Sequence, residues 1–420
     1  MSAPKFDCAI VGAGPAGSAT AFHLARNGVA VVLLDRADFP RSKPCGDCIS
    51  PGANGLLERL GVLSDVQRQA AALDGWRIYA PNGTFFETRF DRVTADPLYR
   101  QAYAIDRRRL DALLLRAARN AGAHVLTRAH VTDIRDEATF HRVYYRDSDH
   151  SPRELRCRFL IGADGLRSII SRRTGLVGRA ARLRKLSLTA HAAAISGIAN
   201  HGELHVIDGA TLGVAPIETG SNDLPACNVT LVAASPKFAR DAAADTRQFF
   251  LRRVRSFPGV RDRIVREDFG ELLGSGPFDR PVRSVVAPGV ALVGDAAGYF
   301  DPFTGQGLYQ ALATAERLAD CVNRAFRAGS PRAPLHDYVR EHARIVNGNR
   351  RLQRIIDNVC ARPALMNRAV RALYGAPNAA ERLTGVTGDL LPVRCLLSPP
   401  LVFTFFTRFF TSETRSAHHR

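Results

Sequence analysis

Lysine, methionine and tryptophan are scarce in this sequence of 420 residues. Only four of its 58 basic residues are lysines, so arginine supplies the other 54, and the formal net charge is +18. The arginines are spread along the whole chain, and none forms a block interleaved with aromatic residues, as a nucleic-acid groove would need. We therefore expect no nucleic-acid partner. The positive charge suits anionic cofactors or lipid headgroups better.

Cysteine spacing indicates neither a disulfide framework nor a metal site. The eight cysteines occur at irregular intervals, unlike those of small disulfide-rich proteins. Cys45 and Cys48 form a C-x-x-C pair, but a structural zinc site needs a second pair of ligands nearby, so we expect no metal. The first residues, MSAPKFDCAIVGAG, run almost directly into an apolar strand. We therefore expect no signal peptide and a reducing, cytoplasmic setting.

Residues 6–35 contain a dinucleotide-binding fingerprint in its full context. The stretch FDCAIVGAGPAGSATAFHLARNGVAVVLLD reads as a strand, a glycine turn, a helix, a second strand and an acid. Gly12 permits the tight turn, Gly14 lets the backbone approach a pyrophosphate, and Gly17 lets helix and strand pack closely. The helix N-terminus offers amides to the anion, and Asp35 can accept hydrogen bonds from ribose hydroxyls. The fingerprint fits FAD or NAD, and its early position favours FAD.

Two distant segments indicate a flavin. Residues 159–168, FLIGADGLRS, form an apolar run that leads into an Asp-Gly pair at Asp164. Residues 290–319, VALVGDAAGYFDPFTGQGLYQALATAERLA, contain a strand that ends at Asp295, a glycine loop and an alanine-rich helix that begins near Gly307. A carboxylate at a strand end can hydrogen-bond a ribityl chain while the helix N-terminus faces the flavin.

In order and spacing, these segments resemble the motifs of the FAD-dependent oxidoreductase superfamily that joins single-component aromatic hydroxylases to geranylgeranyl reductases. A fourth match, YAIDRRRLDALLLRAA in residues 103–118, places Arg107 near the FAD phosphates or adenine by that resemblance. No second G-x-G-x-x-G occurs between residues 150 and 290, so NAD(P)H, as the co-substrate, would dock transiently. The resemblance implies FAD as the cofactor, bound by Gly12, Gly14, Pro15, Ala16, Gly17, Asp35, Arg36, Cys45, Gly46, Arg107, Val131, Asp164, Gly165, Asp295, Pro302, Gly305, Gln306 and Gly307.

The resemblance also implies an α/β fold in three parts. A discontinuous Rossmann-type FAD-binding domain would comprise residues 1–75, 100–175 and 280–330, and a mixed β-sheet substrate domain residues 76–99 and 176–279. The alternating stretch NVTLVAA, residues 228–234, fits a strand of that sheet. His191 and His205 are predicted to be strand residues without a catalytic role. Residues 331–420 form a basic, helical C-terminal region with an apolar tail, expected to pack on the FAD domain or to cover the substrate cavity.

The loop KPCGDCISPG, residues 43–52, leaves several interpretations open. Flavin-linked disulfide reductases space two such cysteines by four residues and carry a second nucleotide-binding domain, and both features are absent here. Two small buried thiols without chemistry are a further interpretation, mainly for Cys48. The loop is similar to the Lys-x-Cys-Gly segment of geranylgeranyl reductases, which lies beside the isoalloxazine and the substrate. By that resemblance Cys45, or a water that it positions, is the candidate proton donor, Gly46 lets the backbone approach the ring, and Asp47 tunes the thiol.

Gly298 and the cysteine loop favour the reductase branch. Hydroxylases of this superfamily usually carry histidine after GDAA, whereas the reductases usually carry glycine, as here. We expect an FAD-dependent oxidoreductase that uses NAD(P)H to reduce a C=C bond of a hydrophobic, isoprenoid- or polyketide-like substrate. The alternatives are an FAD-dependent monooxygenase, which hydroxylates an aromatic or polyketide substrate through a C4a-hydroperoxyflavin, and a non-catalytic electron-transfer or lipid-binding flavoprotein. The tryptophan signatures of geranylgeranyl reductases and flavin halogenases are both missing, which weakens a prenyl substrate and argues against halogenation.

The tail LLPVRCLLSPPLVFTFFTRFF, residues 390–410, is rich in apolar side chains. Its uninterrupted apolar run, residues 401–406, is far too short to span a bilayer. Two interpretations are open: peripheral contact with a membrane surface through its phenylalanines, or a hydrophobic lid or dimer contact. Both suit a hydrophobic small-molecule substrate.

Overall fold

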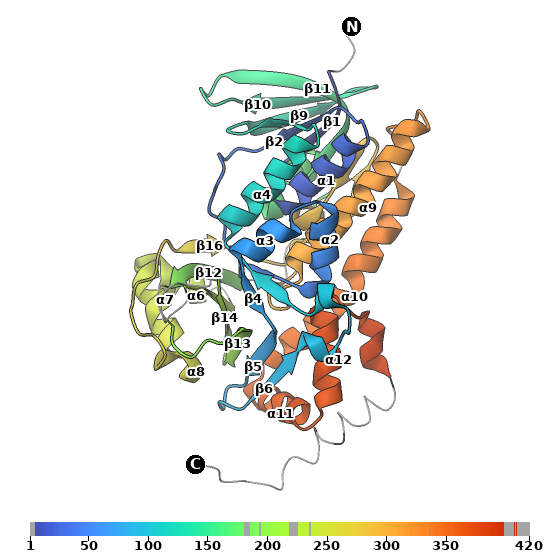
Figure 1. The fold of residues 1–420 in the computed structure, drawn as a ribbon. Helices are drawn as coiled ribbons and strands as arrows, with labels where there is room; N and C mark the ends of the chain where they lie inside the picture. The colour runs from blue at the N-terminus through green and yellow to red at the C-terminus, as the bar shows by residue number, and fades with distance from the viewer. Residues whose placement is uncertain are drawn as a thin grey trace.

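The computed structural model describes residues 5–179, 185–192, 195–217, 226–234, 237–333 and 335–398, together with Thr407 and Phe409. Residues 399–406, 408 and 410 of the predicted tail lie outside the described residues. Figure 1 shows one sheet at the top, a second sheet at the lower left and a group of C-terminal helices at the lower right, joined by the long helices at the centre.

The first sheet carries the dinucleotide-binding fingerprint. Its strand β1 pairs in parallel with both β2 and β11, and β11 pairs in parallel with β18. Central strands of this kind are covered on both faces, which explains the continuous apolar run at Cys8, Ala9 and Ile10, all fully buried. The strands are β1 (Phe6–Val11), β2 (Val31–Leu34), β8 (His124–Leu126), β9 (His130–Asp136), β10 (His141–Arg146), β11 (Pro152–Gly162), β17 (Val286–Ala287) and β18 (Val290–Leu292).

Helix α1 (Pro15–Arg26) packs against both α4 (Arg107–Asn120) and α9 (Gly307–Arg327). These three helices bring together the fingerprint, the segment 103–118 and the segment 290–319, which lie far apart in the sequence. The short elements α2 (Asn54–Arg59), α3 (Leu63–Gln69) and α5 (Ile169–Arg173) complete this part. A small sheet of β3 (Cys48–Ile49), β7 (Ala102–Ala104) and β4 (Ala71–Leu73) holds the cysteine loop.

The second sheet is mixed, because β5 pairs in parallel with β13 while the other neighbours are antiparallel. Helices α6 (Lys237–Ala244) and α7 (Thr246–Arg255) pack on β15, with α8 (Pro258–Arg261) beside them. The predicted strand at residues 228–234 is therefore confirmed as part of β15. The strands are β5 (Gly75–Tyr79), β6 (Phe85–Arg89), β12 (Lys185–Ala192), β13 (His201–Ile207), β14 (Ala210–Pro216), β15 (Cys227–Ala234) and β16 (Leu273–Ser275).

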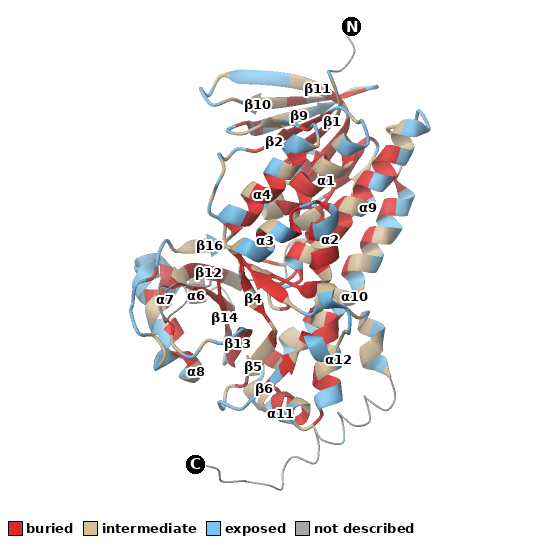
Figure 2. Cartoon of the chain, viewed as in Figure 1, coloured by how far each residue is buried: buried red, intermediate tan, exposed pale blue. Residues whose placement is uncertain are grey.

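The C-terminal helices bridge the two sheets. Helix α10 (His336–Cys360) packs on α9, while α11 (Pro363–Tyr374) and α12 (Pro377–Thr387) pack on β6 of the second sheet. Figure 2 shows buried residues along the inner faces of these helices and exposed residues on their outer faces. Among the described residues, no helix combines the length and the apolar character that a membrane span requires.

The predicted α/β fold, with a Rossmann-type part, a mixed sheet and a helical C-terminal region, is confirmed. The first sheet draws its strands from residues 6–34, 124–162 and 286–292, and the second from residues 75–89, 185–234 and 273–275. The proposed domain boundaries stay a prediction.

Candidate active site

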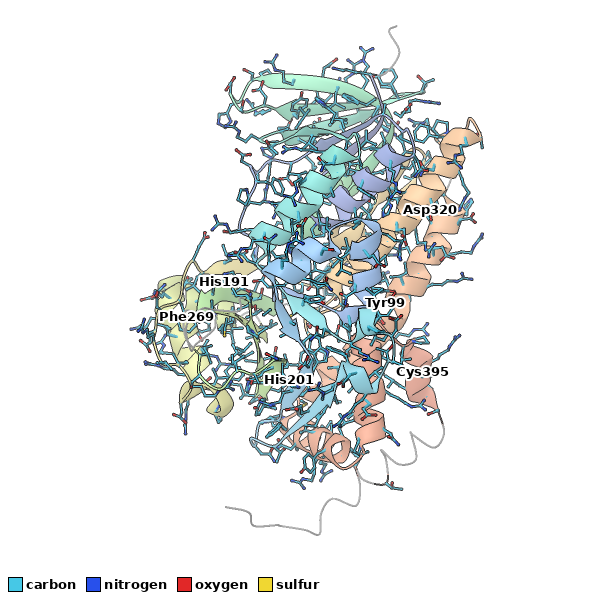
Figure 3. All side chains as sticks on the ribbon, viewed as in Figure 1. Tyr99, His191, His201, Phe269, Asp320 and Cys395 are labelled. Atoms are coloured by element: carbon cyan, nitrogen blue, oxygen red, sulfur yellow. The ribbon has the colours of Figure 1, made fainter. Side chains whose placement is uncertain are left out.

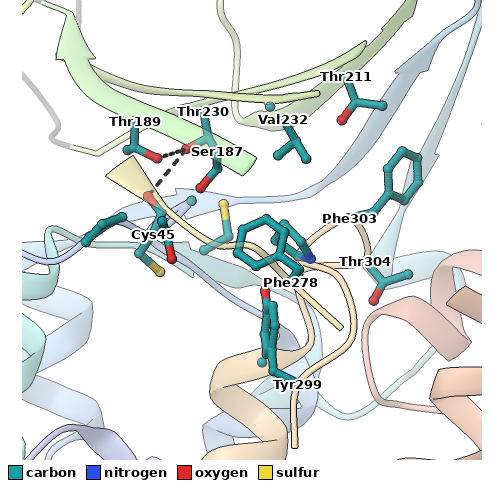
Figure 4. A pocket seen from close by; sticks show the side chains of 18 of the residues that line it. Cys45, Ser187, Thr189, Thr211, Thr230, Val232, Phe278, Tyr299, Phe303 and Thr304 are labelled. Atoms are coloured by element: carbon teal, nitrogen blue, oxygen red, sulfur yellow. Dashed lines mark hydrogen bonds between the residues drawn. The ribbon is translucent and has the colours of Figure 1, made fainter. Parts of the chain in front are cut away.

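One continuous cavity of about 1530 Å³ is lined by residues of the fingerprint turn, the cysteine loop, the second sheet and the C-terminal helices. One end is lined by the fingerprint turn, Asp35 and Arg36, and the middle by Cys45 and Asp295. The other end lies between the second sheet and the helices α10 to α12. Figure 4 shows the region around Cys45, where side chains from the sheet, the cysteine loop and the loop before α9 point into the same space.

The fingerprint turn and the start of α1 line the cavity at Gly12, Gly14, Pro15 and Ala16. Gly12 has φ +102°, and a Cβ there would lie 2.4 Å from the carbonyl oxygen of Ala163. A Cβ at Gly17 would lie 1.8 Å from the carbonyl oxygen of Gly12, so helix and turn meet at their backbones. Gly14 begins α1 without a side-chain cap, and a Cβ there would approach only Arg41, at 3.6 Å. A helix N-terminus beside an arginine is a suitable site for a pyrophosphate.

The carboxylates of Asp35 and Asp164 can accept hydrogen bonds from hydroxyl groups of FAD. Asp35 accepts hydrogen bonds from the backbone N–H of Ala13 at 2.7 Å and of Ala37 at 2.8 Å. A carboxylate has about four lone-pair positions, so capacity for ribose hydroxyls remains. Asp164 accepts a bond from the Ile169 N–H at 2.6 Å, but its Oδ1 is buried and has no partner among the described residues. Since an unpaired buried acceptor is costly, a hydroxyl donor such as the ribityl chain fits there.

Cationic side chains line the cavity between the fingerprint turn and Cys45. Arg107 makes a two-point hydrogen bond to Asp111 at 2.8 and 2.9 Å, and Arg41 lies 3.1 Å from the same carboxylate. Lys43 also lines the cavity. Burial, followed by the charge of Arg107, lowers the pKa of Lys43. With Asp111 fully buried beneath them, these cations suit an anionic cofactor.

Cys45 stands where the charged and apolar ends of the cavity meet. Its thiol hydrogen-bonds the Arg107 guanidinium, which places Arg107 at this junction. The expected position of Arg107 near the phosphates or adenine of FAD stays a prediction. Burial raises the pKa of the Cys45 thiol, whereas Arg107 and a backbone hydrogen bond at Asp47 act in the opposite direction. Gly46 also lines the cavity, and a Cβ there would meet nothing within 4 Å. The open space beside this loop is compatible with a planar ring.

Asp47 lies behind the cavity wall and adopts φ +56°. Its Oδ2 is 2.7 Å from His191 Nε2 on β12, and it accepts a 2.8 Å bond from the Asn228 amide on β15. The same Asn228 amide donates to the Cys45 carbonyl at 2.8 Å. Burial raises the pKa of Asp47, while the bonds from His191 and Asn228 oppose that shift. The second sheet thus holds the cysteine loop by a polar network.

Beyond Cys45 the cavity changes from hydroxyl-lined to apolar. Thr189 and Thr230 hydrogen-bond each other at 3.0 Å, and Thr230 also reaches the Cys45 carbonyl at 3.4 Å. Figure 4 shows these hydroxyls beside Ser187, with Val232 and Phe303 further along. The apolar lining includes Ile78, Phe86, Leu188, Val232, Phe303, Ile356, Val359, Met366, Val370, Leu373 and Leu383.

Asp389, from the C-terminal region, accepts hydrogen bonds from the cysteine loop and from the loop before α9. It accepts hydrogen bonds from Ser50 of the cysteine loop at 2.7 Å and from Gln306, before α9, at 2.7 Å. Asn349 on α10 lies 3.5 Å away. Burial raises the pKa of Asp389 to about 8. The C-terminal region therefore contributes to the site itself.

Most of the residues predicted to bind FAD line this one cavity. Gly17, Val131 and Gln306 do not: Gly17 packs against the turn, Val131 is buried on β9, and Gln306 bonds the C-terminal region. Their roles toward FAD, like those of the other residues, stay predictions. The lining residues are Gly12, Gly14, Pro15, Ala16, Asp35, Arg36, Cys45, Gly46, Arg107, Asp164, Gly165, Asp295, Pro302, Gly305 and Gly307.

Sequence reasoning missed several residues of the site. His191 is a strand residue, as predicted, but it also pairs with Asp47. Asn228 was seen only as part of an alternating strand, and Asp389 only as part of a helical region. Polar residues at buried strand positions, such as Asn228, were the available signal, because buried polar groups need a partner.

A comparison with known protein families identifies the class of protein that has this fold and site. Residues 5–351 match the model of the FAD binding domain family, and the chain belongs to that family of FAD-dependent oxidoreductases.

Two reductases and one solved flavoprotein structure are among the proteins that this chain resembles. The chain is 29% identical over 316 residues to digeranylgeranylglycerophospholipid reductase 2 of Methanopyrus kandleri, covering 73% of this chain and 74% of the relative. It is 28% identical over 340 residues to the menaquinone reductase of Mycobacterium tuberculosis, covering 76% of each. In fold it resembles a flavoprotein/dehydrogenase from Cytophaga hutchinsonii, with a TM-score of 0.83, 19% identity, and coverage of 97% of this chain and 100% of that one.

Proposed function

We propose that this protein uses NAD(P)H and FAD to reduce a C=C bond of a long hydrophobic substrate of the isoprenoid or polyketide type. The observation that carries the proposal is the continuity of the cavity, in which the fingerprint turn and an extended apolar pocket meet at Cys45. The two reductase relatives support it, since their names describe the reduction of a digeranylgeranylglycerophospholipid and of menaquinone.

When bound, FAD supplies the hydride that one carbon of the double bond receives. The other carbon needs a proton, and Cys45 is the proton donor in this proposal because its thiol lines the cavity at the junction. Arg107 stabilises the thiolate that remains, through its hydrogen bond to the sulfur. Asp47 fixes the loop through Asn228, and the apolar walls exclude water from the reacting carbons.

The fit to FAD rests on three features of the chain. The amides at the start of α1 and Arg41 would take the pyrophosphate, and Asp35 the ribose. The unpaired Oδ1 of Asp164 would accept a hydroxyl of the ribityl chain.

A substrate screen tests the proposal. Purified holoenzyme with NADPH or NADH would receive digeranylgeranylglycerophospholipid, menaquinone or an aromatic polyketide, with and without oxygen. We expect anaerobic turnover of an alkene and a product heavier by two hydrogen atoms. A product that gains one oxygen atom only in air would identify a monooxygenase instead, and NAD(P)H oxidation without any altered substrate would indicate electron transfer alone.

We also propose peripheral contact with a membrane through residues 390–410. At the apolar end of the cavity, Ile355 and Leu397 are lining residues that are 61% and 73% exposed. Exposed apolar side chains at a cavity that takes a lipid-like substrate suit a membrane surface. Flotation with vesicles of anionic lipid, with and without residues 390–420, tests this: the full chain should float and the truncated chain should not.

A further inference from the structure

A proton donor at the junction between the charged and apolar ends of the cavity must be recharged after every turnover. This requirement rests on the proposed function, in which Cys45 gives its proton to the substrate. Cys45 is hydrogen-bonded to Arg107, which keeps the thiolate stable but carries no proton that it can release, because guanidinium stays charged at all relevant pH values. Another group must therefore bring a proton from solvent.

His191 is the titratable group that links this loop to solvent. Its side chain is 37% exposed, while that of its partner Asp47 is 3% exposed. Their Nε2 and Oδ2 atoms are 2.7 Å apart, which is within the range for direct proton transfer. Figure 3 labels His191 where the second sheet approaches the central helices. Histidine is also the side chain whose ordinary pKa suits proton exchange near neutral pH.

Asp47 lies between His191 and Cys45. The backbone N–H of Asp47 donates a hydrogen bond to the Cys45 sulfur, and the Asp47 carboxylate interacts with the thiol through its charge. Among the described residues no hydrogen bond joins the carboxylate itself to the thiol, so a transfer between them needs one intervening water. Asn228 holds the geometry, since one amide group donates both to the Asp47 carboxylate and to the Cys45 carbonyl. The titratable and charged groups around Asp47 are His191 from β12, Arg107 from α4, and Cys45 and Cys48 from its own loop.

We propose that His191 and Asp47 form the path by which a solvent proton returns to Cys45. The imidazolium of His191 releases its Nε2 proton to the Asp47 carboxylate, and bulk water reprotonates the imidazole. The Asp47 carboxylic acid then passes the proton through one water to the Cys45 thiolate, which becomes a thiol again. One proton enters from water for each proton given to the substrate, and no electrons move along this path. His191 acts through Asp47 and does not touch the substrate.

The central experiment compares His191→Gln with His130→Gln, a control at an exposed histidine on β9. In holoenzyme, His191→Gln should lower kcat about tenfold or more, in line with the usual contribution of a proton-transfer group. The KM for substrate and the affinity for FAD should stay unchanged, the solvent deuterium isotope effect on kcat should rise, and added imidazole should restore part of kcat. His130→Gln should behave as the parent protein. Unchanged turnover in His191→Gln would overturn the proposal, as would a loss accompanied by weaker FAD binding and no rescue.

A second measurement does not depend on catalysis. In protein freed of FAD, alkylation of Cys45 by iodoacetamide is followed by peptide mass spectrometry across the pH range. If His191, Asp47 and Cys45 are coupled, His191→Gln and Asp47→Asn should both change the pH profile of this alkylation, and His130→Gln should not. Identical profiles in all variants would overturn the path even if alkenes are reduced. A coupled profile in a protein that reduces no alkene would instead show that the proposed function, and not the coupling, is at fault.

Discussion

The two ends of the cavity are built in different ways. The cofactor end is made of short local motifs, in which each glycine or carboxylate has a task that its neighbours in the sequence already define. The apolar end is assembled from β5, β12 and β15 of the second sheet and from α10 to α12, segments that lie far apart in the sequence. The sites for the cofactor can therefore be predicted from local sequence patterns, whereas the shape of the substrate pocket depends on tertiary packing.

The largest effect should come from the fingerprint turn. In Gly12→Ala the new Cβ would lie 2.4 Å from a backbone oxygen at φ +102°, so FAD binding should be lost together with roughly 3 kcal/mol or more of stability. Gly28→Ala is the matched control, since Gly28 also has positive φ, +82°, but no atom within 4 Å of its Cβ position. That variant should keep FAD and lose about 1 kcal/mol. Flavin absorbance after gel filtration and thermal melts measure both. Equal FAD loss in the two variants would show that the close contact is irrelevant.

The second prediction compares substitutions of Cys45 and Cys48 and tests the junction at Cys45. Cys45→Ala should lower kcat about 100-fold or more, because a proton donor is lost, while FAD stays bound. Cys48 packs against the apolar cluster around Leu73 and Phe90, and Cys48→Ala should change kcat less than about twofold. Steady-state kinetics with the best substrate of the screen measures the difference. Full turnover in Cys45→Ala would remove the proposed role of this thiol.

Asp389 links the C-terminal region to the cofactor end. Because its carboxyl group is buried, the free energy of unfolding should depend on pH. Because burial raises the pKa of Asp389 to about 8, the folded protein retains a proton there between about pH 4 and pH 8 that the unfolded chain releases. Stability should therefore fall as the pH rises through this window, by at most about 1.4 kcal/mol per pH unit. Asp389→Asn imitates the protonated acid and should flatten the pH dependence of the melting temperature, whereas Asp262→Asn at an exposed site should not. The same slope in Asp389→Asn and the parent would contradict this assignment.

The apolar end should give the smallest effect. Ile356→Gln places a polar group on the cavity wall and should raise the KM for a long substrate about tenfold, with little change for a short one and none in FAD affinity. Val265→Gln, at an apolar residue that is 55% exposed and does not line the cavity, is the control. An equal change in KM for long and short substrates would mean that the long chain does not lie along α10.

The strand–turn–helix–strand fold of the cofactor end could be predicted from the sequence because its constraints are local. Gly12, Gly14 and Asp35 lie within one strand–turn–helix–strand unit, so their contacts follow from spacing alone. The pairings of Asp47 with His191 and of Ser50 with Asp389 join residues 144 and 339 positions apart, and no local pattern specifies them. Val131 was predicted from family resemblance alone, and it lies on β9 away from the cavity lining.

The most direct test of the junction at Cys45 is a single turnover without oxygen. Enzyme whose bound FAD has been reduced photochemically is mixed with the alkene substrate, and flavin absorbance and product mass are followed together. We expect the flavin to reoxidise as the product gains two hydrogen atoms, with the rate falling about 100-fold in Cys45→Ala. A flavin that stays reduced until air is admitted, followed by a product that has gained oxygen, would contradict the proposal.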